Sequence, residues 1–327
     1  MTDMSQPGKP VKQGRFWGSG RFWGSEAASG LTLISPTALY ALLLLAAPLV
    51  TILLYSVFTD GYLEIIPHFQ ICNYFGHCAS QKMVDGQMVM GEAYDGAWTN
   101  PVYRSIMLRS LYVSIFVTAA TVLLAYPVAY FVSFNVAAHR KSMWMFLITI
   151  PFWTSYVIRV ALWKVILGFN GVINSALLNL HIIDAPLQWI SYNVQAMVLT
   201  LAHAYAPFAI LPIFVALEKI DRSLLEAGQD LGESRFVTFL RVTLPLSMPG
   251  VIAAVLIVFI PTIGDYVTPN LIGGGKIPMI ANAIEKLMLK ADNKPLGSAI
   301  AVSAMVIVAL VSVFFLFLNR RYLKAQK

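Results

Sequence analysis

Six long apolar runs constrain the fold of this chain more than any other feature. A helix needs about 20 predominantly apolar residues to cross the hydrocarbon core of a bilayer. Runs near that length occur at roughly 36–58, 105–134, 143–167, 194–217, 249–271 and 296–318. The composition agrees, since 58% of the residues are hydrophobic and 12% are charged. The sequence therefore predicts an all-α integral membrane protein with six transmembrane helices.

The distribution of basic residues predicts the orientation of these helices. An even number of spans leaves both termini on one side of the membrane. Fourteen of the 23 Lys and Arg residues fall in the two tails and in the second and fourth connections. Because basic residues accumulate in cytoplasmic segments, we expect both termini and the fourth connection to be cytoplasmic. The net charge of +7 thus follows from topology and gives no reason to expect a nucleic-acid partner.

The fourth connection, at about residues 218–248, is polar and carries helix start and stop signals. The Ser-Leu-Leu-Glu sequence that begins at Ser223 is a capping box and predicts a short helix there. Gly232 can adopt the left-handed conformation that ends such a helix. Ser234 can then cap a second helix, which we expect Pro245 to interrupt. The pattern predicts a helix, a tight turn and a helix between two spans.

This spacing resembles the EAA loop of ABC importer permeases, in which Glu-Ala-Ala is followed by three residues and Gly, and then by nine residues, an aliphatic residue, one residue and Leu-Pro. The matching positions here are Glu226, Ala227, Gly228, Gly232, Val242, Leu244 and Pro245. Gly228 stands where the family has Ala, so we expect a slightly less stable helix. The alternative is an amphipathic connector that lies on the bilayer surface.

Four further segments resemble the permeases of spermidine/putrescine ABC importers: 151–159, 167–174, 264–274 and 295–305. The resemblance covers about residues 36–320. It implies a type I ABC importer permease fold in a bacterial inner membrane, with the EAA loop as the contact through which ATPase motion reaches the membrane. Permeases for ferric iron, thiamine, phosphonates and opines share parts of these segments, so the solute stays open.

The same resemblance implies three protein partners: a dimer of cytoplasmic ABC ATPase subunits, a second homologous permease and a periplasmic solute-binding protein. Residues 31–327 would form the transmembrane permease domain and residues 1–30 a cytoplasmic tail. The tail repeats the hexapeptide Gly-Arg-Phe-Trp-Gly-Ser at residues 14–25. Arg and Trp suit the lipid headgroup region, which would make membrane lipid a further partner. A disordered tail is the alternative.

Polar residues inside the third and fifth spans are candidates for the solute path. A charge such as Arg159 is costly within a span and normally faces protein or water. Asp265 is the only acid expected at membrane depth. A cationic, polyamine-like solute would be stabilised by a carboxylate and by aromatic faces, so Asp265, Tyr266 and Trp153 are the candidates. Alternatively, Asp265 pairs with Arg159 or Lys164, or caps a broken helix.

The long connection at residues 60–104 holds the only two cysteines, Cys72 and Cys78. In an oxidising compartment they could form a disulfide, and two free thiols are the alternative. A metal site is less favoured because the nearby His68 and His77 complete no usual Cys/His framework. We expect the rest of the connection to be a solvated loop.

Two other functional classes are disfavoured. Gly275-Lys276 is followed by Ile277 instead of Ser or Thr, so it is not a phosphate-binding loop, and ATP hydrolysis would belong to a partner subunit. An integral membrane enzyme would need convergent catalytic groups, but the five His residues form no metal-binding pair four residues apart and no second acid accompanies Asp265. No cofactor is expected. A channel would not need a coupling loop of this spacing.

Overall fold

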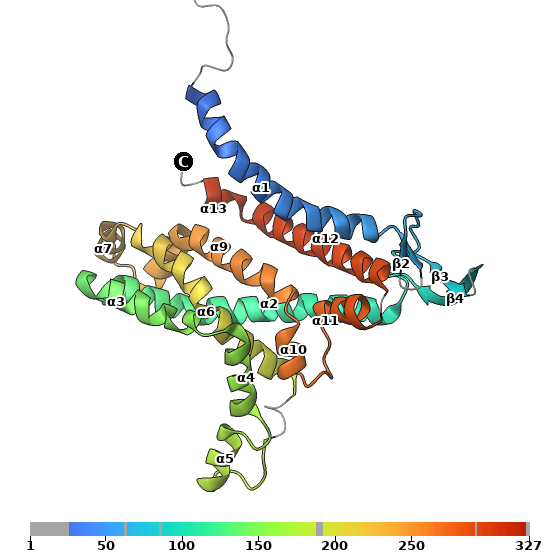
Figure 1. Cartoon of the computed structure of the whole chain (residues 1–327). Helices are drawn as coiled ribbons and strands as arrows, with labels where there is room; N and C mark the ends of the chain where they lie inside the picture. Colours follow the sequence, from blue (N-terminus) through green and yellow to red (C-terminus); the bar gives the residue numbers. More distant parts are fainter. Residues whose placement is uncertain (1–25, 62–63, 85–86, 188–191, 292, 325–327) are drawn as a thin grey trace, which may run out of the picture. The chain divides into compact units, whose positions relative to one another are not determined.

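The structure, a computed structural model, describes residues 26–61, 64–84, 87–187, 192–291 and 293–324 (Figure 1). The chain divides into two units, residues 1–51 and 52–327. The first contains most of helix α1 (Glu26–Tyr55). The part of α1 from Leu33 is long and apolar enough to cross a membrane.

Helix α1 begins earlier than the sequence predicts. The apolar run was expected from residue 36, whereas the helix starts at Glu26, so that Pro36 lies inside it. Residues 1–25 of the expected tail, with the repeated hexapeptide, lie outside the described residues, whereas 26–30 already belong to α1.

The second unit is a helical bundle with a small sheet at one end, called here the sheet end; the end that carries α7 is called the loop end (Figure 1). Its long helices are α2 (Pro101–Tyr130), α6 (Val194–Glu218), α9 (Leu244–Ile263) and α12 (Lys294–Leu318). The shorter helices are α3 (Ala138–Thr149), α4 (Tyr156–Leu167), α5 (Val172–Asn179), α7 (Arg222–Asp230), α8 (Arg235–Thr238), α10 (Val267–Leu271), α11 (Ile280–Glu285) and α13 (Arg320–Lys324).

The prediction of six spans is confirmed, and two of them, the third and the fifth, are shifted. The fifth was expected at 249–271 and is found at Arg235–Ile263. Six helical stretches of the described residues are long and apolar enough to cross a membrane: Leu33–Tyr55, Pro101–Asn135, Tyr156–Asn179, Val194–Glu218, Arg235–Ile263 and Lys294–Leu318. The third span was expected at 143–167, but the chain breaks near Thr154, whose backbone is extended. Pro151 has no N–H for the helix ladder, and α3 gives way there to a short 3-10 turn (Ile150–Trp153) that ends at Thr154. Helix α4 therefore leaves in a new direction (Figure 1).

Helices α2, α6 and α9 form the centre of the bundle. Fully buried apolar side chains from each of them meet there, among them Val117, Leu201 and Val258. Gly250 lets α9 approach α6 closely, since a β-carbon there would collide with the Pro212 carbonyl and the Ala216 side chain. Apolar area offers no driving force between helices in lipid, so small residues at such crossings supply the close packing.

A four-stranded sheet occupies the connection where the sequence predicted a solvated loop. Its strands are β1 (Thr59–Gly61), β2 (Glu64–Ile66), β3 (His77–Val84) and β4 (Gln87–Asp95), in the order β2-β1-β3-β4. The pairs β1–β2 and β3–β4 are antiparallel, β1–β3 is parallel, and β3 carries an irregularity between Ala79 and Gln81. The expectation of a loop was wrong because two local hairpins form, and the β1–β3 pairing, which local composition does not reveal, joins them into one sheet.

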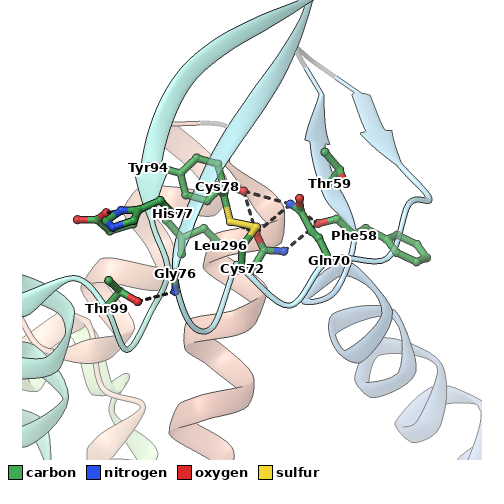
Figure 2. The surroundings of a disulfide bond; sticks show 12 residues. Phe58, Thr59, Gln70, Cys72, Gly76, His77, Cys78, Tyr94, Thr99 and Leu296 are labelled. Atoms are coloured by element: carbon green, nitrogen blue, oxygen red, sulfur yellow. Dashed lines mark hydrogen bonds and ion pairs between the residues drawn. A yellow bond between two sulfur atoms is a disulfide. The ribbon is translucent and has the colours of Figure 1, made fainter.

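The structure joins Cys72 to Cys78 by a disulfide, with Cα atoms 5.4 Å apart, beside this sheet (Figure 2). Next to it, the fully buried Asn73 donates hydrogen bonds to the carbonyl groups of Ser56 and Phe58 at 3.0 and 2.8 Å. Its own carbonyl oxygen accepts from the Tyr94 hydroxyl at 2.8 Å. These bonds tie the end of α1, the cysteine loop and β4 together.

Candidate functional site

The fourth connection forms the predicted helix, turn and helix, with a different start. Helix α7 begins at Arg222, and its N-cap is Asp221, whose carboxylate accepts from the Ser223 N–H at 3.0 Å. The predicted capping box at Ser223 is wrong because Asp221 precedes it and has the extended backbone that a cap requires. This hydrogen bond holds the pKa of Asp221 below its usual value.

The prediction for Gly232 is confirmed, since its φ is +85°. The Gly232 N–H donates to the Gln229 carbonyl at 2.9 Å, and the Glu233 N–H donates to the Gly228 carbonyl at 3.1 Å. This pair of bonds is a Schellman motif, which satisfies the last carbonyl groups of α7. A β-carbon at Gly232 would meet no atom within 4 Å, so glycine is favoured there by backbone geometry alone.

Gly228 lies where α7 crosses α8. A β-carbon there would lie 3.1 Å from the Thr238 side chain, which is tighter than ordinary van der Waals contact. The glycine therefore has a packing role beyond the lower helix propensity expected from the sequence. Ser234 caps α8 as predicted, accepting from the Val237 N–H at 3.4 Å.

Pro245 does not interrupt the second helix, contrary to expectation. Helix α8 continues through a π-helical segment (Phe239–Thr243) into α9, so that Arg235–Ile263 is one helical stretch. The wider π turn changes the hydrogen-bond register just before the proline, as shown by the Leu244 N–H donating to the Phe239 carbonyl. The π turn thus accommodates Pro245, which has no backbone N–H to donate to the helix. The turn is linked directly to a membrane span.

The surface of this connection combines acidic and apolar side chains. Glu226 and Ala227 are exposed. Leu231 and Phe236 are 86% and 68% exposed, whereas Leu244 and Pro245 are half-buried where α9 enters the bundle. Apolar side chains projecting from a loop beside acidic residues suit a surface that a protein partner covers.

Asp265 caps a helix after a break, which is one of the alternatives that the sequence left open. Helix α9 ends at Ile263, and α10 follows. One Asp265 carboxylate oxygen, Oδ1, accepts from the Val267 and Thr268 N–H groups at 3.1 and 3.5 Å, which caps α10. The other, Oδ2, is buried without a hydrogen-bond partner. The Tyr156 and Thr268 hydroxyl groups nevertheless lie close enough to the carboxylate to interact with it.

Aromatic side chains that the sequence interpretation missed surround this carboxylate. Tyr156 and Tyr205 lie near enough to interact electrostatically with Asp265. Their ring centroids are 6.2 Å apart, and the Tyr156 hydroxyl lies 2.9 Å from the Thr268 hydroxyl oxygen. Tyr205 in turn lies beside Phe208, with centroids 6.1 Å apart. The available signal was one tyrosine within each of two predicted spans, 143–167 and 194–217.

Trp153 and Tyr266 have largely or half-exposed side chains, whereas Arg159 lies close enough to Tyr205 to interact with it electrostatically. Trp153 is 78% exposed and packs edge-on against Phe146. Tyr266 directs a half-exposed side chain outward although it follows Asp265. Arg159 donates to the Ala204 carbonyl at 3.3 Å and lies over the Phe152 ring. Among the described residues, no ion pair joins Asp265 to Arg159 or Lys164.

Comparison with known proteins now identifies the family. Residues 88–324 match the family described as binding-protein-dependent transport system inner membrane component. The chain belongs to this family. It is therefore a membrane-spanning transport component and not an enzyme.

Individual relatives agree with the resemblance seen in the sequence. The chain is 37% identical to the spermidine/putrescine transport system permease protein PotB of Haemophilus influenzae over 65% of this chain and 73% of that protein. It is 34% identical to PotB of Escherichia coli over 65% of this chain and 76% of that protein.

Solved structures support the fold. A bacterial ABC transporter involved in the import of the acidic polysaccharide alginate contains a chain that matches with a TM-score of 0.61, 16% identity and coverage of 90% of this chain and 95% of that one. A second structure, of an alginate ABC transporter in complex with alginate pentasaccharide-bound periplasmic protein, matches with a TM-score of 0.63, 16% identity and coverage of 92% and 98%. The permease fold predicted from the sequence is thus confirmed.

Proposed function

We propose that this chain is one of two homologous permease subunits of an ATP-driven polyamine importer in a bacterial inner membrane, with both termini in the cytoplasm. The observation that carries this proposal is the α7–α8 connection, a capped helix and a glycine turn fixed to a membrane span. The similarity to PotB proteins supports spermidine or putrescine as the solute.

The α7–α8 connection would be the docking point of one cytoplasmic ATPase subunit. Its exposed Leu231 and Phe236 side chains would be covered in the complex, and Glu226 would contribute an acidic contact. Because α8 continues into α9, displacement of the turn would pass directly to a core span. The second permease would bind the second ATPase subunit in the same manner.

The Asp265 cluster would meet the ammonium groups of the solute. An ammonium group leaving water needs a negative partner or aromatic faces. The carboxylate of Asp265 and the rings of Tyr156 and Tyr205 would provide both. Tyr266 and Trp153 remain predicted members of the path, with exposed side chains that would face the second permease or the solute. A periplasmic binding protein would deliver the solute at the sheet end.

The docking role is tested by reversing one charge in the complex. Glu226→Lys, expressed with the ATPase, the second permease and the binding protein, is expected to reach the membrane in normal amount, lose the ATPase on purification and abolish uptake. Asp184→Lys, at an exposed acid outside the loop, is the matched control and is expected to retain the ATPase. Normal uptake with Glu226→Lys would show that the loop is not the docking point.

The solute role of Asp265 is tested by Asp265→Asn. The amide can still cap α10 but lacks the charge, so the complex is expected to assemble while the spermidine concentration for half-maximal uptake rises about tenfold or more, as for loss of a charged hydrogen-bond partner. Reduced assembly, partly rescued by Arg159→Gln, would assign Asp265 a structural role instead. Wild-type uptake of ferric iron, thiamine, a phosphonate or an opine in place of spermidine would replace the proposed solute.

A further inference from the structure

Four elements of the second unit converge on one carboxylate at the loop end. Glu218, the last residue of α6, accepts a hydrogen bond from the Ser133 hydroxyl at 2.6 Å and an ion-pair contact from the Lys141 amine, also at 2.6 Å. Ser133 belongs to the π-helical segment that follows α2 (Phe131–Asn135), and Lys141 belongs to α3. Arg222, the first residue of α7, donates to the Ser133 carbonyl at 3.2 Å.

This Glu218 cluster (Ser133, Lys141, Glu218 and Arg222) is partly shielded from water. The Lys141 and Glu218 side chains are 13% and 35% exposed, and Ser133 is buried. Charged hydrogen bonds between shielded groups are stronger and more directional than exposed ion pairs. The start of α7 is thereby fixed to the α2–α3 connection, which lies far from it in the sequence.

The far end of the α7–α8 connection has a different attachment. There the chain runs through the π-helical segment Phe239–Thr243 into α9, and the Phe239 ring packs edge-on against Tyr126 and Tyr130 of α2, with centroids 5.7 and 5.9 Å away. Helix α7 is a stiff element between these two attachments because both of its ends are capped. A displacement of α7 can therefore be transmitted to the bundle through either attachment.

We infer that the Glu218 cluster is a second transmission contact, which carries displacement of α7 to the α2–α3 connection, in parallel with the covalent route into α9. Glu218 and Lys141 act as positioning residues. The inference rests on the proposed function, since it assumes that an ATPase displaces α7. The inference goes beyond the proposed function because it assigns a second route of transmission outside the EAA-like segment.

The test compares solute imported per ATP hydrolysed in proteoliposomes containing the whole importer. Glu218→Gln and Lys141→Met each remove one charge of the pair. We expect normal assembly and continued ATP hydrolysis, with import per ATP reduced about tenfold, which is typical of a lost coupling interaction. The exchanged pair Lys141→Glu/Glu218→Lys is expected to recover at least a third of the wild-type ratio, and less than all of it because Arg222 would then face Lys at position 218.

A matched control lies at the sheet end. Glu285→Gln removes the 3.5 Å contact with Lys290, and the import ratio is expected to stay at the wild-type value. Ser133→Ala, which keeps both charges, is expected to lower the ratio less than Glu218→Gln.

Two outcomes would overturn the inference: a wild-type ratio in both single-charge variants, or lost assembly with an unchanged ratio per assembled complex. The wild-type importer tests the proposed function separately. If wild type imports no polyamine, the proposed function is wrong, whatever the variants do.

Discussion

At the loop end of the second unit, α7 and α8 are held by turns, caps and a few ionic contacts, whereas at the sheet end β1 to β4 are held by a disulfide and a buried hydrogen-bond network. The loop end leaves Leu231 and Phe236 largely exposed. The sheet end places Asn73 out of contact with solvent and satisfies its side chain on both sides.

The difference indicates two kinds of surface. A region that docks on a moving partner needs exposed apolar groups and stiff local geometry, but few bonds that would prevent displacement. A region cross-linked by a covalent bond and a buried amide is expected to remain fixed while the rest moves. We therefore expect substitutions at the loop end to impair coupling and substitutions at the sheet end to impair stability.

The largest expected effect comes from two glycines with the same geometry. Gly232 and Gly275 both have positive φ, +85° and +71°, and a β-carbon at either would meet no atom within 4 Å. Replacement by Val imposes similar backbone strain, at least about 1–2 kcal/mol. Gly232→Val is expected to abolish uptake at normal membrane abundance, and Gly275→Val to preserve uptake. Equal losses of uptake would remove the functional distinction between the two ends.

The second prediction concerns stability at the sheet end. Asn73→Ala would remove the side-chain donor of the Ser56 carbonyl and leave the Phe58 carbonyl only the 3.3 Å bond from Gln70, which is expected to cost about 2–3 kcal/mol. Thermal unfolding of the purified protein and protease cleavage near residues 69–75 would measure this. The exposed His77–Asp95 contact is the control, and Asp95→Asn is expected to change stability by less than about 1 kcal/mol. Similar effects of both variants would contradict a rigid network around Asn73.

The third prediction is the contribution of the disulfide. The two cysteines are six residues apart, so the disulfide closes a small loop. The reduced chain entropy of the unfolded state is then expected to stabilise the fold by about 2 kcal/mol. The double variant Cys72→Ser/Cys78→Ser is expected to lower the unfolding temperature of the sheet end, while import per ATP in the assembled complex stays unchanged. A loss of import per ATP without a change in unfolding would assign the sheet end a part in coupling.

The sequence predicted features that depend on neighbouring residues and missed those that depend on distant ones. The six spans, the Gly232 turn and the Ser234 cap follow from local composition or backbone preference. The cap of α7 was placed two residues late, because Asp221 and Ser223 are both good caps and only the chain path decides between them. Pro245 was misjudged since a π turn cannot be seen in a residue pattern.

The missed residues of the candidate sites share one property, which is contact across the bundle. Glu218 and Lys141 are 77 positions apart, and Tyr156 and Thr268 are 112 apart. The only sequence signal for the first pair was opposite charge at the ends of two predicted helices. The sheet likewise depends on pairing between β1 and β3 across the cysteine loop, which residue propensities do not specify.

The smallest expected effects are changes of folding stability with pH, which have opposite sign at the two ends. At the sheet end, burial, with a smaller contribution from the charge of Asp60, raises the pKa of Tyr94 from 10.0 to about 12. The folded state thus favours the neutral phenol, whose hydrogen bond to Asn73 is lost on ionisation. The stabilisation is fully present below pH 10 and disappears as the pH rises toward 12. At the loop end, the lowered pKa of Asp221 gives stabilisation that is present above its unfolded value of 3.8 and is lost as the pH falls below it.

Paired variants separate these two titrations from the rest of the protein. Tyr94→Phe removes the ionisable group, so the unfolding temperature of wild type minus that of the variant is expected to decrease between pH 10 and 12 and to be constant between pH 6 and 9. Asp221→Asn keeps a capping oxygen without a charge, and its difference from wild type is expected to change only below about pH 4, by a small amount because the carboxylate is exposed. If the Tyr94 difference stayed constant through pH 12, the phenol would not be buried in the network that distinguishes the sheet end from the loop end.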